Sequence, residues 1–116
     1  PVLVLGDMLE LGKFSSNEHQ KLIPIIRSIK PRLIVAIGNQ MSSISKNLKS
    51  NFETFCFKDS KTAKDIVPEL IKNNDLILIK GSNGMKLDLI IESINRHFET
   101  LSNKGYLPEM DKNYVI

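Results

Sequence analysis

The feature that most constrains the fold of this sequence is a regular alternation of short apolar strands with helical segments. Apolar runs, largely continuous rather than alternating with polar residues, predict strands at residues 2–5, 33–37, 52–57 and 76–79. Helical spacing of apolar residues predicts helices at 15–30, 41–48, 60–71 and 84–98. Each strand is thus followed by a helix, which is the pattern of a parallel sheet buried on both faces.

This alternation predicts an α/β fold, a three-layer sandwich with helices on both faces of a mainly parallel sheet. Right-handed crossovers favour the strand order 3-2-1-4, which places the first and fourth strands side by side. The 116 residues allow one compact core. Helical periodicity lapses after Glu99, so we expect one domain over residues 1–99 and a loosely docked tail over 100–116.

Local signals predict where the helices begin and bend. Ser15 and Glu18 fit a capping box that opens the first helix. Pro24 is expected to kink that helix, because proline lacks the backbone donor and crowds the preceding turn. Ser60 or Thr62 is expected to cap the helix that follows the third strand.

Composition excludes several classes of protein. A single cysteine, Cys56, excludes a disulfide framework and a cysteine-based zinc site, and its place in an apolar strand favours core packing. No apolar run approaches the roughly 18 residues that span a membrane, and the first residues lack the features of a signal peptide. We therefore expect a cytoplasmic protein. Pro1 is not an initiator methionine, so we also expect an excised domain.

The formal net charge of +3 does not indicate a nucleic-acid partner. Lysines interleave with acidic residues along the chain, arginines number only three, and aromatic residues do not alternate with basic ones. A nucleic-acid surface needs such clustering on one face.

The loops after the first and fourth strands carry the candidate functional residues. In open α/β sheets, ligands bind beyond the carboxyl ends of the strands, at the point where the strand order reverses. Asp7 and Glu10 follow the first strand, and Lys80, Ser82 and Asn83 follow the fourth. An acidic loop here suits an ammonium group or a hydrated metal, and a lysine suits a carboxylate or phosphate.

The second loop also contains glycines that lead into the last predicted helix. The turn from Gly81 to Gly84 would present the backbone N–H groups of a helix N-terminus to an anion. The alternative is structural: glycines at strand ends are common turn residues, and Ser82 or Asn83 could cap the helix.

Other signals are weaker. The string KGSNGMK lacks the spacing of a phosphate-binding loop, and no G-x-G-x-x-G follows the first strand, so an ATPase or dinucleotide site of the usual kind is not expected. His19 and His97 each lack a second ligand at metal-binding spacing, and we expect no metal site. His97 suits the end of the last helix, whereas His19 either lies at the surface as a cap or overhangs the crevice.

The strings VLGDMLELG and LILIKGSNGMKLDLIIE resemble the C-terminal domain of the Mur ligases, over about residues 2–98. The pattern LGDM-x-ELG, followed by KGS, is typical of the branch that joins D-alanyl-D-alanine to UDP-N-acetylmuramoyl-tripeptide. The resemblance implies a Rossmann-like domain of a three-domain, ATP- and Mg²⁺-dependent enzyme of peptidoglycan synthesis, which serves cell shape and division. It implies an acyl-phosphate intermediate that the amine of the dipeptide attacks, and a monomer.

The resemblance assigns roles to residues of this chain that match the family's two motifs. Gly6, Asp7, Met8, Glu10, Leu11 and Gly12 match the first motif, His19 the histidine after it, and Lys80, Gly81 and Ser82 the second. The resemblance implies substrate-binding roles for Asp7, Glu10, Lys80, Gly81, Ser82 and Asn83, and loop-shaping roles for Gly6, Met8, Gly12 and His19. Asn83 replaces the arginine of many relatives.

The family's phosphate loop and its aspartate–tyrosine–asparagine motif are absent from this sequence. We therefore expect the chain to be inactive alone and to leave the fourth strand as an exposed edge. The alternative hypothesis is a stand-alone flavodoxin-like module that binds a small anion at the same crevice.

Overall fold

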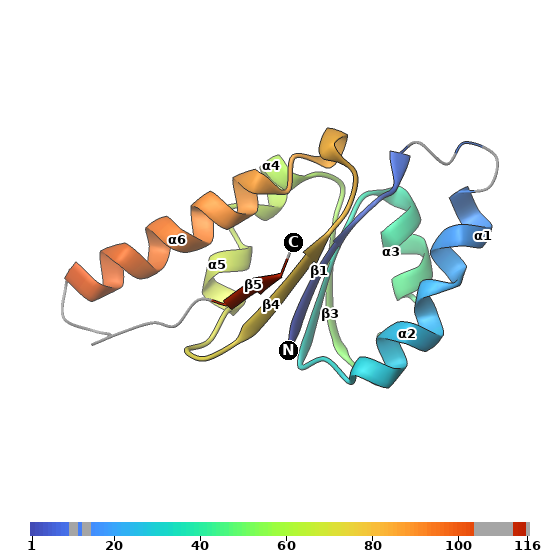
Figure 1. Cartoon of the computed structure of the whole chain (residues 1–116), viewed down its shortest axis with the longest axis horizontal. Helices are drawn as coiled ribbons and strands as arrows, with labels where there is room; N and C mark the ends of the chain where they lie inside the picture. The colour runs from blue at the N-terminus through green and yellow to red at the C-terminus, as the bar shows by residue number, and fades with distance from the viewer. Residues whose placement is uncertain (10–11, 13–14, 104–112, 116) are drawn as a thin grey trace.

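The computed structural model describes residues 1–9, 12, 15–103 and 113–115, without the side chains of Ser15 and 113–115. A parallel sheet of five strands has the order β3-β2-β1-β4-β5 and lies between two layers of helices (Figure 1). The strands are β1 (Val2–Gly6), β2 (Leu33–Ile37), β3 (Glu53–Phe57), β4 (Leu76–Lys80) and β5 (Asn113–Val115). The predicted α/β class and the order 3-2-1-4 of the first four strands are confirmed.

Six α-helices of the described residues cover the two faces of the sheet. They are α1 (Ser15–Gln20), α2 (Leu22–Ile29), α3 (Asn39–Ser45), α4 (Ser60–Ala63), α5 (Val67–Leu70) and α6 (Asp88–Asn103). The first three lie on one face and the last three on the other (Figure 1). Within the described residues, no helix is long and apolar enough to cross a membrane.

Successive strand residues alternate between two cores, because side chains of a strand point to opposite faces. Val2, Val4 and Ile79 pack toward α4, α5 and α6 in one core. Leu3 and Ile34 pack against α2 in the other. β1 and β2 are therefore apolar at every position, which is why their sequences form continuous runs.

The fifth strand corrects the prediction of an exposed fourth strand. Asn113–Val115 pair in parallel with Leu76–Leu78. Because β1 pairs with β4 from Ile77 onward, β4 has a neighbour on both sides at Ile77 and Leu78. The helix α6 also continues past the expected domain boundary at Glu99, to Asn103.

The helix boundaries show where local signals were right and wrong. A kink was predicted at Pro24, and the structure instead divides the segment at Lys21: α1 ends at Gln20, and α2 begins at Leu22 and contains Pro24. Asp59, not Ser60 or Thr62, caps α4: its carboxylate accepts a hydrogen bond from the Thr62 amide at 2.8 Å. The capping box predicted for Ser15 depends on a side chain outside the described residues.

The last helix begins four residues later than predicted, at Asp88 rather than Gly84. Asn83–Met85 form a single 3₁₀ turn, and Lys86 follows in the left-handed conformation with φ of 54°. A left-handed residue cannot continue a right-handed helix. The two segments are therefore separate, which changes the geometry of the predicted anion site.

Candidate functional site

The loops after β1 and β4 meet at the carboxyl edge of the sheet, as the strand order requires. The amide of Ser82 donates to the Asp7 carbonyl at 3.1 Å, so the two loops are joined directly. A Cβ on Gly81 would lie 2.9 Å from the Cα of Gly6. Only glycine permits the two backbones to approach so closely.

Asp7 is buried and its carboxylate is engaged by α3. One oxygen accepts the Met41 amide at 2.7 Å and the other the Gln40 amide at 3.1 Å. These are the N–H groups at the start of α3, which have no partner within their own helix. Asp7 thus caps a helix that lies far from it in the sequence, and a negative charge at this end also favours the helix dipole.

Gly38 makes room for this cap. Its φ is 105°, a backbone angle that residues other than glycine rarely adopt. A Cβ at this position would lie only 2.4 Å from the Asp7 carboxyl carbon. The Asp7 amide also donates to the carbonyl of Ile37 at 3.1 Å, next to Gly38. Sequence analysis missed this role of Gly38, although a glycine directly after the second strand was a signal for it.

Two side chains hold the first loop in place. The amide of Met8 donates to Nε2 of His19 at 3.0 Å, and the amide of Leu9 donates to Oγ of Ser82 at 2.8 Å. His19 is 1% exposed. Because Nε2 accepts, the ring is in the tautomer with its proton on Nδ1. The structure thus brings His19 and Ser82, predicted from separate motifs, to the same loop.

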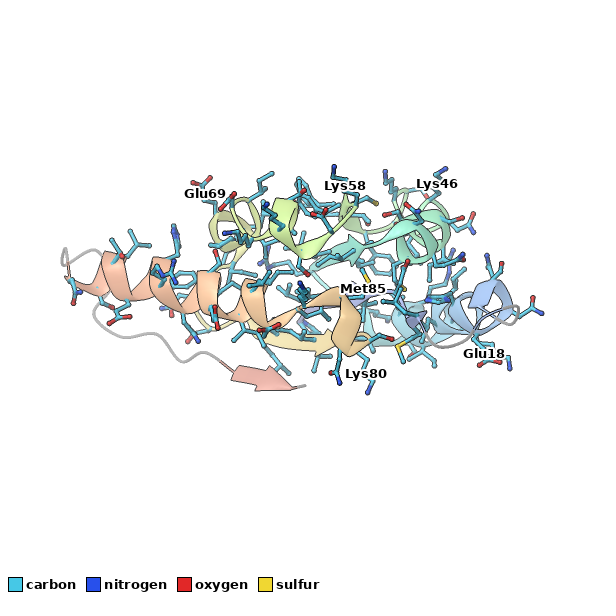
Figure 2. All side chains as sticks on the ribbon, turned by 90° about the horizontal axis from the view of Figure 1, so that it is seen from above. Glu18, Lys46, Lys58, Glu69, Lys80 and Met85 are labelled. Atoms are coloured by element: carbon cyan, nitrogen blue, oxygen red, sulfur yellow. The ribbon has the colours of Figure 1, made fainter. Side chains whose placement is uncertain are left out.

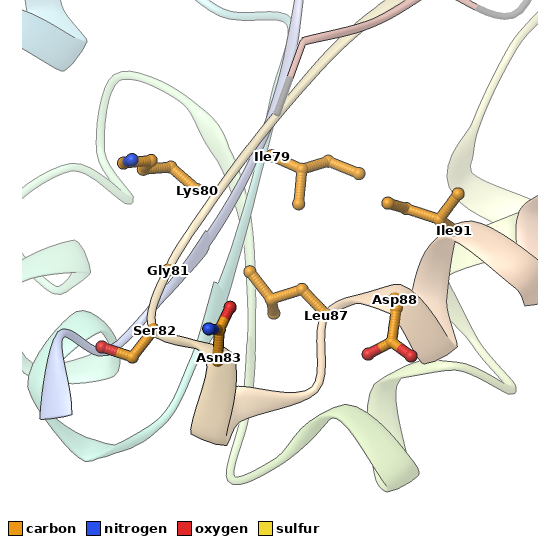
Figure 3. A pocket seen from close by; sticks show the side chains of 8 residues that line it. All are labelled: Ile79, Lys80, Gly81, Ser82, Asn83, Leu87, Asp88 and Ile91. Atoms are coloured by element: carbon orange, nitrogen blue, oxygen red, sulfur yellow. The ribbon is translucent and has the colours of Figure 1, made fainter.

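Lys80 lies at the end of β4 and borders two cavities. Figure 3 shows its side chain on the opposite side of the strand from Ile79 and Leu87. The larger cavity, of about 460 Å³, is lined on its polar side by Ser82, Asn83 and Asp88. The smaller, of about 270 Å³, is mostly apolar and lies toward α1. Lys80 is exposed and forms no ion pair within the described residues.

The prediction of a helix N-terminus at Gly81–Gly84 is wrong, since Asn83 and Gly84 belong to a 3₁₀ turn and α6 begins only at Asp88. A single turn has little dipole to attract an anion. In addition, Asp88 in the first turn of α6 lines the same cavity. An anion here therefore depends on the ammonium of Lys80 rather than on backbone amides.

The remaining predicted residues lie apart or outside the described residues. Glu10 and Leu11 are outside them. Gly12 is exposed with φ of 55°, and no atom lies within 4 Å of a Cβ built there, so its conformation and not crowding favours glycine. Among the described residues, no three histidine, cysteine, aspartate or glutamate side chains are grouped to hold a metal ion.

Comparison with known proteins supports the resemblance of the two motifs. No protein-family model matches the chain. Three curated relatives are named UDP-N-acetylmuramoyl-tripeptide–D-alanyl-D-alanine ligase. The Rickettsia prowazekii protein is 33% identical over 89 residues, which are 77% of this chain and 20% of that protein. The Bacillus subtilis protein is 32% identical over 96 residues, 80% of this chain and 21% of that protein. The Buchnera aphidicola protein is 34% identical over 95 residues, 80% of this chain and 20% of that protein.

Two crystal structures of MurF from Acinetobacter baumannii share the fold. Their TM-scores are 0.65 and 0.63, at 24% and 25% identity. Each comparison covers 82% of this chain, and 22% and 21% of the MurF chains respectively. The chain spans about a fifth of the length of the curated relatives it matches. In both sequence and fold, the chain matches the C-terminal domain of the MurF ligases.

Proposed function

We propose that this chain is the C-terminal domain of an ATP-dependent ligase that joins D-alanyl-D-alanine to UDP-N-acetylmuramoyl-tripeptide, and that it supplies the binding site for the dipeptide. The names of the curated relatives support this reaction. The observation that carries the dipeptide site is the exposed ammonium of Lys80, unpaired within the described residues, beside two cavities where the β1 and β4 loops join.

Lys80 binds the carboxylate of the dipeptide in this proposal. A dipeptide has one carboxylate and one amine, and holding the carboxylate fixes the direction from which the amine attacks the activated carboxyl carbon of the tripeptide. A new amide bond forms, the activating phosphate leaves and the amine loses its proton. Correct placement of the two reactants is a large part of the catalysis in such a step.

The residues around Lys80 act on the shape of the site. Both carboxylate oxygens of Asp7 accept amide hydrogen bonds from α3. We therefore assign Asp7 to holding the loop rather than to binding the amine of the dipeptide. His19 and Ser82 hold the same loop through the amides of Met8 and Leu9. Asn83 lines the larger cavity together with Lys80. In this proposal its side-chain amide donates a second hydrogen bond to the carboxylate.

ATP and Mg²⁺ are assigned to other parts of the ligase. The described residues hold no cluster of carboxylate, histidine or cysteine side chains that suits a metal ion. We therefore expect the isolated chain to release no phosphate from ATP, even with both other substrates present.

Kinetics of Lys80→Ala in the intact ligase that carries this segment test the dipeptide site. A charged hydrogen bond is worth about 1.5–3 kcal/mol, so the KM for D-alanyl-D-alanine should rise roughly 10- to 150-fold. The KM for ATP should stay within about twofold, since Lys80 does not touch ATP in this proposal.

Two variants serve as controls for this test. Lys80→Arg, which keeps the charge, should recover part of the loss. Lys49→Ala removes an exposed lysine beyond the C-terminal end of α3, and it should change neither the KM for D-alanyl-D-alanine nor the KM for ATP. An equal rise in both KM values for Lys80→Ala would contradict the assignment.

A further inference from the structure

A third cavity lies at the same edge of the sheet, away from Lys80. Its volume is about 500 Å³, and its walls are the segment Lys58–Lys64, which follows β3, and the segment Gly84–Leu89, which follows β4. Seen from above, Lys58 and Lys80 lie on opposite sides of Met85 (Figure 2). The cavity is thus distinct from both cavities that Lys80 borders, yet it also opens beyond the carboxyl ends of strands, where α/β sheets bind ligands.

The lining of this cavity is strongly basic. Lys58, Lys61, Lys64 and Lys86 surround it, against the single carboxylate of Asp59. The local excess of three positive charges equals the formal net charge of the entire chain, +3. None of the four lysines forms an ion pair in the part of the chain that the structure describes. Asp59 offsets only part of their mutual repulsion, because it is one carboxylate beside four lysines.

The two walls are fixed relative to one another. Ser60, which is 2% exposed, donates its hydroxyl to the Met85 carbonyl at 2.5 Å and so ties α4 to the 3₁₀ turn. Asp59 is committed as the cap of α4. Hydrogen bonds from Thr62, and then the charges of Lys58 and Lys61, lower the pKa of the Asp59 carboxyl. The Ser60 bond thus joins the two segments that carry the lysines, and the Asp59 carboxylate is held at the start of α4 by Thr62.

We infer that this lysine cavity binds a ligand with two or more linked phosphate groups. Two linked phosphates carry about three negative charges near neutral pH, which matches the local excess. Lysine ammonium groups bind phosphate as compact point charges, and four of them line this cavity. The volume is within the range of small-molecule sites. Met85 and Leu89 add an apolar wall for the remainder of such a ligand.

This inference does not depend on the ligase proposal, because none of the four lysines belongs to the proposed dipeptide site. The shared chemistry is the linked phosphates, and two sources can provide it: an inorganic polyphosphate or a nucleoside diphosphate. Comparison of pyrophosphate with ADP, both without added metal, separates the two.

Titration of the isotope-labelled chain with pyrophosphate, followed by amide chemical shifts at low ionic strength, tests the inference. We expect saturable shifts at residues 58–64 and 84–89. Single Lys→Gln variants at the four positions should each weaken binding about fivefold, the effect of one charge at contact distance in water. The matched controls Lys46→Gln and Lys49→Gln remove the same charge near the end of α3 and should change binding less than about twofold, since distant charges are screened.

Each outcome decides the question. Equal affinity for pyrophosphate and ADP supports a site for the phosphates alone, and tighter binding of ADP supports a nucleoside diphosphate against Met85 and Leu89. Equal losses in the cavity and control variants would show only non-specific attraction and overturn the inference. So would shifts confined to other residues, or tighter binding of a hexaglutamate peptide than of pyrophosphate, which would indicate an acidic protein partner. Unchanged amide spectra of the free variants exclude unfolding as the cause.

Discussion

Replacement of Asp7 tests whether this residue stabilises the fold rather than binding a ligand. Asp7→Ala removes the acceptor of two amide hydrogen bonds, from Gln40 and from Met41, which is 1% exposed. Hydrogen bonds to a charged group contribute about 1.5–3 kcal/mol each, but water can reach the more exposed of the two amides. We therefore expect a loss of about 2–4 kcal/mol, at the upper end of what a helix cap contributes or above it.

Urea denaturation of the chain measures this loss directly. The midpoint should fall with an unchanged m-value, and the thermal midpoint should fall by roughly 8–16 °C for a domain of this size. Asp7→Asn should lose less, because its amide oxygen still accepts one of the two bonds. Asp65→Asn, at an exposed aspartate, is the matched control for charge and should be neutral. A loss below about 0.5 kcal/mol for Asp7→Ala would refute the capping role.

Two further substitutions test the loop junction and the cap of α4. Gly81→Ala places a Cβ 2.9 Å from the Cα of Gly6, and since backbone must move, urea denaturation should show a loss of about 1–3 kcal/mol; an unchanged midpoint would mean that the loops separate freely. Hydrogen bonds from Thr62 lower the pKa of Asp59 from its ordinary value of 3.8. A carboxyl whose pKa is lower in the folded state stabilises the fold above its unfolded pKa, and this contribution is lost as the pH falls through the folded pKa. Asp59→Asn should therefore flatten the fall of stability in acid, as measured by denaturation at a series of pH values, and a profile parallel to that of the unsubstituted chain would contradict this.

The sequence predicted the first four strands because each is a local signal. An apolar run such as Leu33–Ile37, buried at every position, needs no knowledge of its partners to be recognised. The fifth strand had no such signal. Three residues are too few for a hydrophobic pattern, and the pairing of Asn113–Val115 with β4 joins segments that are distant in the chain. Contacts of this kind are decided by the folded structure, not by local propensity.

The predicted start of the last helix was wrong for a related reason. Residues after Gly84 have helical spacing, yet Lys86 adopts a left-handed conformation. Leu87 explains this, because its side chain is 8% exposed and packs against the glycines of both strand ends; a Cβ on Gly81 would lie 2.9 Å from its Cδ1. The burial of Leu87 at this position keeps the residues before Asp88 out of α6. The close approach of Gly6 and Gly81, against which Leu87 packs, forms only in the folded structure and is not visible in the sequence.

Asp7 shows why an acidic residue at the end of a strand is an ambiguous signal. At the carboxyl edge of a parallel sheet, ligands bind and the following helices begin, so unpaired N–H groups and ligand groups compete for the same side chains. Sequence spacing places Asp7 at this edge but does not say which of the two it meets. The choice depends on α3, which begins more than 30 residues later, and on Gly38, whose missing side chain leaves room for the carboxylate. Lys80 is the opposite case, because it is a donor at an edge where helices need acceptors. Its ammonium therefore has no structural use at the start of a helix, which is why the lysine is the stronger candidate for binding substrate.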